Sequence, residues 1–476
     1  MVRTKVAPPS DEFAGADFGD ARITHRLMRV ADAVAKVPAA GLPAAAGSDG
    51  ELEGVYRFLR NERVTPAKIL DPHLARTVER VGDRALLVVH DTTEFAFGGK
   101  AHREGLGRIN VKGQKQGFFA HLALAVAADG SREPLGIVGL QTIVRSGPST
   151  KHARSQRRPG TSNELSRWFE LALLVGKTFP KAIHLMDREA DSYEIVSNLM
   201  AGGARFVIRI CRDRCLAFEE GRESKLFAAA DRGPIFASRT VPLSRRQKES
   251  DPEDRRAHPP RVERMAKLRI RATTHTIKRP IYASLKEHPL ALAVSVVTVE
   301  EVNTPLGATP ISWRLITTEP VETVEQIEAI IDAYRARWVI EEYFKALKTG
   351  CAFEKRQLES FRTLVNALAV FSVVAWRLLV LRSVARGRAS APAAEALTPR
   401  QVRLLQRVST MKGPGVPRIE MPANPTARDA LLAVARIGGH IKNNGDPGWQ
   451  VLGRGYDSLL LMELGWRAAQ TPFGEM

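Results

Sequence analysis

Cysteine is scarce in this chain, and its scarcity excludes several classes of protein. Only Cys211, Cys215 and Cys351 occur among 476 residues. They form no paired pattern of zinc ligands and no plausible disulfide framework, which excludes zinc-finger and disulfide-stapled folds. We therefore expect the protein to work in a reducing cytoplasm.

Long uninterrupted apolar runs are also missing. Residues 1–13 have no apolar core of the kind that a signal peptide requires. The most apolar run, at residues 364–381, is broken by Asn366, Ser372 and Arg377. A buried helix explains this run better than a membrane span does, so we expect no membrane partner.

Acidic side chains are too few to balance the basic ones. The chain has 71 Lys and Arg against 52 Asp and Glu, which gives a formal net charge of +19. Such an excess predicts binding to a polyanion through release of counterions, and nucleic acid is the simplest partner of this kind. The length of 476 residues, of which 44% are hydrophobic, predicts about two to four domains.

The chain begins with a helical region and continues with strands and helices. Residues 12–80 have helical periodicity, with basic side chains that either form a solvated face or contact DNA. Further on, apolar runs predict buried strands, two of which end in an acidic residue, Asp91 and Asp187. The predicted order is strand, hairpin pair, helix, strand, helix and strand, at residues 84–91, 121–130 with 134–145, 163–177, 182–187, 187–203 and 204–210.

Later regions depart from this pattern. Residues 211–322 have β character and are expected to form an insertion that contains a charged loop at residues 244–261. Residues 385–425 are rich in Arg, Ala and Pro, which predicts a linker. Residues 427–470 return to helical periodicity.

The stretch at residues 323–350 is predicted to form one long helix. Thr323 and Gln326 have the spacing of a capping box, and Gly350 is suited to end the helix in the left-handed conformation. Five side chains project within an arc of about 80° on a 3.6-residue period: Tyr334, Arg337, Glu341, Lys345 and Lys348. This face is either a solvated stripe of ion pairs or a carboxylate metal ligand flanked by cations that hold phosphates.

Three carboxylates are candidates for phosphoryl chemistry. Asp91 and Asp187 are predicted at strand ends, where open α/β sheets bind ligands, and Glu341 lies within the helix. Such a set can hold a pair of hard divalent cations about 4 Å apart, which activate water or a 3′-hydroxyl for in-line displacement. This chemistry needs no protein nucleophile, and the chain has no convincing Ser/His or Cys/His constellation. Competing carboxylates that the sequence leaves open are Glu94, Glu189, Asp191 and Glu342.

These residues resemble those of a known enzyme family. Asp91-Thr-Thr, Asp187-Arg-Glu-Ala-Asp and the spacing Tyr334-x₂-Arg337-x₃-Glu341-x₆-Lys348 are similar to motifs of the DDE transposases of bacterial cut-and-paste insertion sequences, the insertion-sequence-four family. More narrowly, they resemble the Tn-five type with its YREK signature. The likeness extends from GDARITHRL at residues 19–27 to ARIGGH at residues 435–440, almost the whole chain.

The resemblance implies an α/β fold with a ribonuclease-H-like mixed sheet flanked by helices and interrupted by a β-rich insertion, plus all-α N-terminal and C-terminal regions. Residues 1–80 would form a helical domain that binds the transposon end. Residues 81–385 would form the catalytic domain, with its insertion at about residues 211–322. Residues 386–476 would form a helical dimerisation region.

The resemblance also implies roles for individual residues. Asp91, Asp187 and Glu341 would be the metal triad, holding two Mg²⁺ ions per active site, with Mn²⁺ able to substitute. Trp313 would receive a base that is flipped out of a hairpinned end. Residues that would contact DNA near the cleavage site are Tyr334, Arg337, Lys345, Lys348, Arg188 and Arg209. Residues that would contact the transposon end are Arg22, Arg26, Lys36 and Arg57.

Two departures from the family pattern concern the DNA-binding region. Ile23 stands where a second arginine would be expected, and Val37 stands where a tyrosine would be expected. We therefore expect this protein to recognise a different end sequence.

The implied activity is cut-and-paste transposition of double-stranded DNA by a homodimer that bridges two transposon ends. One alternative is a ribonuclease-H-fold nuclease or resolvase that cuts DNA without strand transfer. Another is a catalytically inactive DNA-binding inhibitor of transposition or a domesticated transposase. The intact set of Asp91, Asp187 and Glu341 argues against an inactive protein, because a chain released from catalytic selection is free to lose those residues.

Overall fold

The chain folds into two compact units. The computed structural model describes residues 9–99, 102–109, 115–145, 164–217, 224–243, 260–387, 389–413, 416–441 and 446–470. One unit comprises Met1–Ser162 together with Trp338–Met476, and the other comprises Asn163–Arg337. The second unit is therefore contiguous in sequence and interrupts the first.

The first unit begins with helices, which confirms the helical prediction for residues 12–80. They are the 3₁₀ helix η1 (Pro9–Phe13) and the helices α1 (Ala21–Lys36), α2 (Leu42–Ala46), α3 (Asp49–Arg60) and α4 (Pro66–Val81). Asp20, Ser48 and Thr65 cap three of these helices, each accepting a backbone N–H of the first turn with its side chain.

An antiparallel group of strands follows in the first unit: β1 (Leu86–Phe97), β2 (Gly107–Arg108), β3 (Gln116–Ala127) and β4 (Pro134–Ile143). Strand β3 pairs with β4, as the predicted hairpin requires. The predicted end of β1 at Asp91 is wrong, because Asp91 lies mid-strand opposite Leu122. Thr93, Phe95 and Phe97 are buried while Glu94 is exposed. This alternation is typical of a strand with one buried face, and β1 accordingly continues to Phe97.

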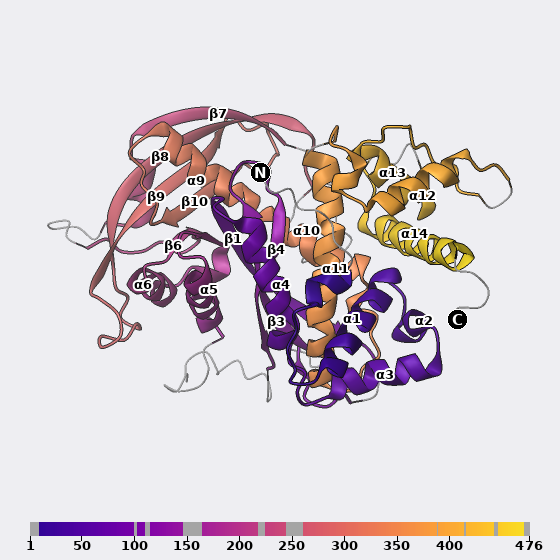
Figure 1. The fold of residues 1–476 in the computed structure, drawn as a ribbon. Coiled ribbons are helices and arrows are strands. Elements are labelled where there is room, and N and C mark those ends of the chain that lie inside the picture. The colour runs from indigo at the N-terminus through magenta and orange to yellow at the C-terminus, as the bar shows by residue number, and fades with distance from the viewer. Residues whose placement is uncertain are drawn as a thin grey trace. The chain divides into compact units, whose positions relative to one another are not determined.

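The first unit packs around α11 (Phe361–Gly387), which is buried along nearly its whole length. This helix is long and apolar enough to cross a membrane, but its most apolar window is entirely buried by the rest of the protein. The prediction of a buried helix at residues 364–381 is confirmed. Figure 1 shows α1, α3 and α4 beside α11.

Three helices complete the first unit: α12 (Pro399–Thr410), α13 (Ala427–Ile437) and α14 (Trp449–Gln470). The linker predicted at residues 385–425 is wrong in its middle part. Thr398 and Gln401 form a capping box that begins α12, and Leu404 and Leu405 bury one face of that helix. The predicted helical character of residues 427–470 is confirmed.

The second unit is built on a mixed sheet in the strand order β5-β6-β10-β9-β8-β7. Strands β5 and β6 are parallel, and the other neighbouring pairs are antiparallel. The strands are β5 (Ile183–Met186), β6 (Arg205–Arg209), β7 (Ile235–Leu243), β8 (Arg264–Lys278), β9 (Ala291–Val302) and β10 (Ser312–Thr317). Its helices are α5 (Ser166–Thr178), α6 (Tyr193–Ala201), α7 (Leu226–Asp231) and α9 (Val324–Ala336). The expected β insertion is thus present, and residues 244–259 of its charged loop lie outside the described residues.

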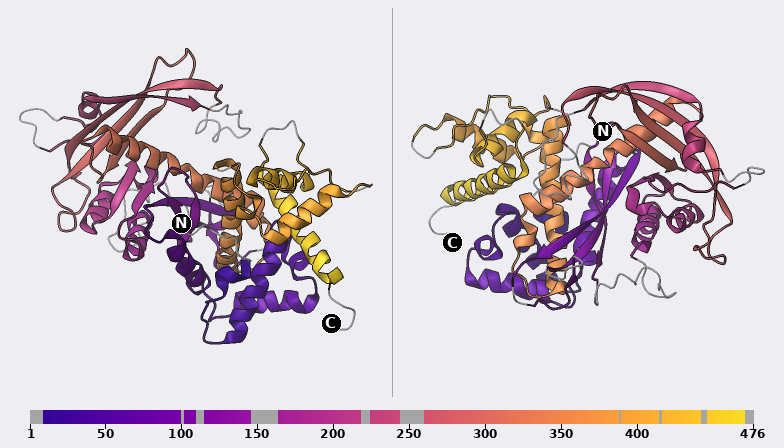
Figure 2. Two further views of the ribbon diagram at one scale, coloured as in Figure 1. Left: turned by 45° about the horizontal axis from the view of Figure 1, so that its top comes forward. Right: turned by 180° about the vertical axis from the view of Figure 1, so that it is seen from behind.

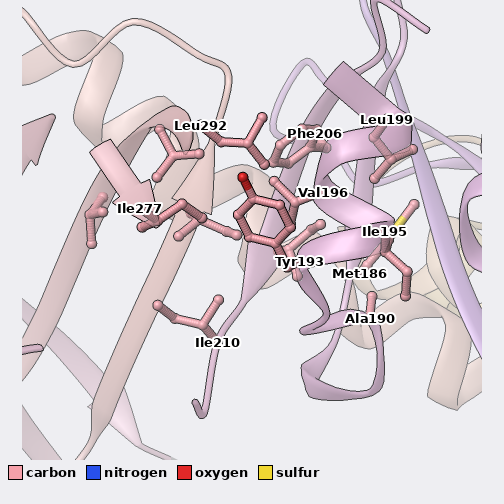
Figure 3. Close-up of a cluster of buried hydrophobic side chains, with 14 of the residues drawn as sticks. Met186, Ala190, Tyr193, Ile195, Val196, Leu199, Phe206, Ile210, Ile277 and Leu292 are labelled. Atoms are coloured by element: carbon pink, nitrogen blue, oxygen red, sulfur yellow. The ribbon is translucent and has the colours of Figure 1, made fainter. Parts of the chain in front are cut away.

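Figure 2 shows the long strands β7 to β9 as a curved sheet with α9 running along it. Arg239 of β7 forms an ion pair with Asp332 of α9 at 2.9 Å. The core of this unit gathers α6, β5, β6, β8 and β9 around the fully buried Tyr193, whose ring points toward Ile277 and Leu292 in Figure 3. The hydroxyl of Tyr193 donates to the carbonyl of Pro289 at 2.8 Å. A mixed sheet with helices and all-helical terminal regions confirms the predicted α/β fold class.

The prediction of a single helix at residues 323–350 is wrong in its second half. The capping box of Thr323 and Gln326 is present at the start of α9. The chain then forms α10 (Trp338–Lys345) and a π-helical turn, η4 (Ala346–Gly350). Gly350 has no left-handed conformation, which is adopted instead by Ala352 with φ 46°. The π turn spreads extra residues over one turn and so rotates Lys348 away from the position that a straight α-helix would give it.

A buried polar network joins three elements of the first unit. Nδ1 of His73 lies 2.5 Å from the carboxylate of Glu12, and Nε2 of His73 accepts the N–H of Ile137 at 3.0 Å. His73 is therefore neutral, and the charge on Glu12 is balanced by Arg80 at 2.8 Å. The Arg80 guanidinium also lies over the ring of Trp376 at 4.5 Å. The network thus fixes η1 against α4, β4 and α11.

The ionised form of Glu12 stabilises the fold at neutral pH. Burial raises the pKa of Glu12, but His73 and Arg80 more than offset it and lower that pKa to about 2. A carboxyl group with a lowered folded-state pKa contributes stability above its unfolded value of 4.5, and this contribution disappears as the pH falls toward 2. We expect Glu12→Gln to reduce the free energy of unfolding by about 3 kcal/mol at pH 7 and by about half as much at pH 3.

Urea denaturation of both proteins at pH 7, 5 and 3 measures this difference. Glu79→Gln, which alters an exposed carboxylate on the same helix as His73, serves as the control. An equal loss of stability at pH 7 and pH 3 would contradict the assignment of the stabilisation to the ionised carboxylate.

Candidate active site

Polar side chains of the second unit meet at one edge of its sheet. Asp187 directly follows β5, and Arg209 is the last residue of β6. Because β5 and β6 are parallel, both residues lie at the carboxyl ends of their strands. Trp313 lies near the start of the antiparallel strand β10, at the same edge, and the Arg209 guanidinium donates to the carbonyl of Ser312 at 3.1 Å. Ligands bind at such strand ends in open α/β sheets.

Asp187 is held in place by the turn that follows it. Its side chain caps the short 3₁₀ helix η3 (Arg188–Ala190) by accepting the N–H of Glu189 at 2.8 Å. Asp187 is half-buried, whereas Arg188 is exposed. The prediction that Asp187 ends a strand is confirmed.

Tyr334, near the end of α9, is the centre of this group. Its phenol is buried and is hydrogen bonded with the guanidinium groups of Arg209 and Arg337. Burial raises the pKa of Tyr334, and the nearby Asp187 raises it further, while Arg337 and Arg209 lower it. The phenol is therefore neutral at physiological pH. Burial lowers the pKa of Arg209, and the nearby positive charge of Arg188 lowers it further.

Trp313 packs edge-on against Tyr334, with 5.7 Å between ring centroids and 67° between ring planes. Trp313 is half-buried. The structure thus brings together six of the residues predicted from the sequence: Asp187, Arg188, Arg209, Trp313, Tyr334 and Arg337.

The other predicted site residues belong to the first unit. Asp91 lies on β1, Glu341 lies on α10, and α10 packs against β1. Both carboxylates are half-buried, and the Asp91 carboxylate accepts the N–H of Thr92 at 2.8 Å. Lys345 is exposed at the end of α10, and the Lys348 ammonium lies over the ring of Phe95 of β1 at 5.6 Å.

The competing carboxylates of the second unit have structural partners. Glu189 forms an ion pair with Arg167 of α5 at 2.8 Å. Asp191 is fully buried, pairs with Arg214 and accepts the backbone N–H groups of Cys211 at 2.6 Å and Arg212 at 2.7 Å. The sequence carries no signal for Arg167 or Arg214, because each lies about 20 residues from its partner.

The competing carboxylates of the first unit are Glu94, which lies on the opposite face of β1 from Asp91, and Glu342, which has structural partners. Glu94 lies three residues after Asp91 on β1, and therefore on the opposite face of that strand. Glu342 forms an ion pair with Arg382 at 3.3 Å and accepts the indole N–H of Trp449 at 3.2 Å. The role of Trp449, 107 residues further along the chain, was missed from the sequence because nothing in the local pattern points to it.

The donor set that the family resemblance implies consists of carboxylates. Within the described parts of the chain, no three His, Cys, Asp or Glu side chains come together as metal ligands. Carboxylate oxygens are nevertheless the donors that hard divalent cations prefer. Asp91, Asp187 and Glu341 are each half-buried, which fits a ligand reached from solvent.

Basic residues of the N-terminal helices differ in exposure. Arg22 on α1 is highly exposed and pairs with the capping residue Asp20 at 2.9 Å. Arg57 on α3 is exposed, 3.6 Å from Glu53 of the preceding turn. Arg26 instead joins α1 to α3 through Glu51 at 2.9 Å, and Lys36 is half-buried at the end of α1.

Arg26 packs closely against a glycine of the neighbouring helix. A Cβ atom at Gly54 of α3 would lie only 2.6 Å from the Arg26 guanidinium. Arg26 therefore has a structural contact as well as its predicted place on the DNA-binding face.

Comparison with known protein families gives two matches. Residues 137–375, about half of the chain, match the family described as transposase DDE domain. Residues 9–64 match the family described as transposase DNA-binding. The first match includes Asp187, Trp313 and Glu341, and the second covers η1, α1, α2 and α3.

The two neighbouring aspartates, Asp187 and Asp191, should respond differently to removal of their charge. Asp191→Asn leaves the buried Arg214 without its counter-charge and should cost about 3 kcal/mol of unfolding free energy. Asp187→Asn keeps an oxygen that accepts the N–H of Glu189, and should cost less than about 1 kcal/mol. Thermal and urea unfolding measure both effects. Equal losses for the two variants would remove the distinction between a structural and a ligand-binding aspartate.

Proposed function

The chain belongs to the family of transposases with a DDE catalytic domain, and from this premise we propose that it carries out cut-and-paste transposition of the Tn-five type. The family membership establishes a DNA transposase with a metal-dependent catalytic domain and a DNA-binding region at residues 9–64. The proposal adds the route by which the DNA is cut and rejoined.

The observation that carries the proposal is the group at the sheet edge of the second unit. There the phenol of Tyr334 is hydrogen bonded with the guanidinium groups of Arg209 and Arg337 and lies near the half-buried Asp187 carboxylate, and Arg188 lies near Arg209. Three guanidinium groups are well suited to a phosphodiester, because each presents several donors to phosphate oxygens. The same group contains the aromatic ring of the half-buried Trp313, and such a ring suits an unstacked base.

Asp91, Asp187 and Glu341 are proposed to hold the metal ions, with Mg²⁺ as the ion in use and Mn²⁺ as a substitute. Two bound divalent cations would supply activation of the attacking oxygen and stabilisation of the leaving oxygen. The likeness of Asp91-Thr-Thr, Asp187-Arg-Glu-Ala-Asp and Glu341 to the family motifs, together with the position of Glu94 on the opposite face of β1, favours this choice of three carboxylates.

The proposed reaction starts with attack of water on a phosphodiester at the transposon end, which frees a 3′-hydroxyl. This hydroxyl then attacks a phosphodiester of the opposite strand, which closes a hairpin and releases the 3′-hydroxyl of the flanking DNA. A second water opens the hairpin and frees the same 3′-hydroxyl, which attacks a phosphodiester of target DNA and displaces a target 3′-hydroxyl. Arg209 and Arg337, together with Lys345 and Lys348 of the first unit, are proposed to bind the phosphates. Their fixed positive charges offset the charge that builds up on the phosphoryl oxygens.

The proposed complex is a homodimer that bridges two ends, because each end must stay at one active site through successive steps. Arg22, Arg26, Lys36 and Arg57 are proposed to contact the end, with residues 386–476 as the dimerisation region. The large exposure of Arg22 and Arg57 supports a role for these two side chains in binding DNA phosphates.

Glu341→Gln tests the catalytic assignment. We expect this variant to bind DNA that carries the inverted repeats of the element as tightly as wild type does. Its rate of strand nicking should fall by about a thousandfold or more, because the amide is a poor ligand for a hard cation. Gel-shift titration and denaturing gels in Mg²⁺ and Mn²⁺ measure the two properties.

The products of this assay also separate the alternatives. A hairpin that is later opened supports cut-and-paste transposition, whereas nicking without a hairpin or insertion supports a nuclease or resolvase. Tight binding by wild type with no cleavage in either metal would support an inactive binding protein. Nicking by Glu341→Gln at the wild-type rate would refute its place in the triad.

Trp313→Ala tests the proposed flipped-base site. Loss of stacking should slow hairpin closure by about tenfold while leaving the first nick near the wild-type rate. Trp313→Phe, which retains an aromatic face, should recover most of the hairpin rate. Quenched time courses on denaturing gels separate the two steps, and equal slowing of both would assign Trp313 to general packing against Tyr334.

A further inference from the structure

Three residues of α14 form a stripe with a spacing of four residues. Trp449, Gly453 and Asp457 lie on one face of this helix, because residues four apart are neighbours along an α-helix. Each of the three contacts a different part of the first unit. The first two place the C-terminal helix against the segment that carries Glu341 and Lys348, and the third places it against the N-terminal region.

Trp449, at the start of the stripe, engages α10 through Glu342. Its indole N–H donates to the Glu342 carboxylate at 3.2 Å. The Arg382 guanidinium lies over the Trp449 ring at 4.5 Å and pairs with Glu342 at 3.3 Å. Arg382 and Trp449 are both buried, so the contact is shielded from solvent and sensitive to the loss of any partner.

This contact sets the rotation of α10 about its own axis. Glu342 directly follows Glu341, and consecutive residues of an α-helix project about 100° apart. A Glu342 side chain fixed toward Arg382 and Trp449 therefore holds Glu341 in a different, defined direction. No contact to Glu341 itself is needed for this effect.

Gly453, one turn further along α14, engages the π-helical turn. A Cβ atom at this position would lie 2.8 Å from the carbonyl oxygen of Gly350, closer than carbon and oxygen atoms can pack. The absence of a side chain thus allows α14 to touch the backbone at the end of the turn that contains Lys348. By contrast, a Cβ atom at Gly465 of the same helix would meet nothing within 4 Å.

Asp457, at the end of the stripe, reaches the N-terminal region. Its carboxyl group accepts the backbone N–H of Ala39. The neighbouring Arg356 is buried and donates to the carbonyls of Cys351, Pro38 and Ala40. Residues 38–40 follow α1 within the DNA-binding match, so one helix face contacts both the DNA-binding region and the α10–η4 segment.

We infer that α14 is a positioning element for the catalytic segment and that Trp449 and Gly453 are its positioning residues. The Trp449–Glu342–Arg382 contact sets the direction of Glu341, and the Gly453–Gly350 contact sets the position of the turn that carries Lys348. This inference rests on the proposed function, in which Glu341 is a metal ligand and Lys348 binds phosphate. It adds a requirement for the C-terminal helix in each chemical step.

Gly453→Ala, compared with Gly465→Ala in the full-length protein, tests the inference. The added methyl group at position 453 must push α14 and η4 apart, whereas the same change at position 465 meets no neighbour. We expect Gly453→Ala to slow the first nick at saturating DNA by about tenfold or more, because small displacements of catalytic groups cost large factors in rate. The Mg²⁺ concentration for half-maximal nicking should rise, and the dissociation constant for end DNA should match wild type. Gly465→Ala should match wild type in all three measurements.

Trp449→Phe gives a second test that leaves the packing nearly intact. It keeps an aromatic ring under Arg382 and removes the N–H donor to Glu342. We expect a smaller slowing of the nick and a rise in the half-maximal Mg²⁺ concentration, with unchanged DNA affinity and only a small fall in melting temperature from loss of the buried hydrogen bond. If Gly453→Ala does not fold, the nicking rate and Mg²⁺ dependence of Trp449→Phe decide whether α14 positions the catalytic segment.

The outcomes separate this inference from the proposed function. Nicking by wild type but not by Glu341→Gln, with wild-type rates and Mg²⁺ dependence in both α14 variants, would overturn the positioning role alone. Losses of rate, DNA affinity and melting temperature in parallel, with an unchanged Mg²⁺ midpoint, would also overturn it, because they indicate general destabilisation. Failure of wild type to nick at all, or equal nicking by Glu341→Gln, would overturn the proposed function and this inference with it.

Discussion

Burial of α11 is the constraint on which the first unit depends. A helix that is apolar on all sides cannot remain in water, and each side must be covered by another element. The covering elements come from distant parts of the chain: α1, α3 and α4 from the N-terminal region, β4, η4, and α13 from the C-terminal region. A single hydrophobic requirement therefore assembles the DNA-binding region, a group of strands and the C-terminal helices around one axis.

Apolar burial alone leaves the covering elements free to slide or rotate, and buried polar contacts remove this freedom. Arg80 satisfies Glu12, lies on Trp376 and donates to the carbonyl of Leu135 at 2.7 Å, so η1 and α4 have one register against β4 and α11. Arg382 likewise fixes α10 against α14, because it pairs with Glu342 and lies over the ring of Trp449. In the second unit, Asp191 ties the start of α6 to the residues after β6. Each contact is costly to break because its partners are shielded from water.

Much of this organisation could be predicted from the sequence, because it follows from local patterns. The apolar run before Asp187 and the capping box of Thr323 are both present where the pattern placed them. The end of β1, the break after Ala336 and the π turn before Cys351 could not be predicted in the same way, because they depend on tertiary packing. The grouping of Asp187, Arg209, Trp313 and Tyr334 was anticipated only through a family resemblance, since more than 140 residues separate its ends. The partners of Glu342 carry no local signal at all.

The interruption of the first unit by the second has a consequence for synthesis of the protein. Asn163–Arg337 is contiguous and is fully synthesised well before the end of the chain, whereas the N-terminal helices must wait for α11 and the helices beyond it. At typical translation rates the delay between residue 162 and residue 476 is roughly 15 to 60 seconds. During that time the apolar faces of α1, α3 and α4 have no permanent cover. A nascent or truncated chain would therefore be a natural substrate for chaperones that bind exposed apolar helices, and premature termination before α11 would yield an aggregation-prone product.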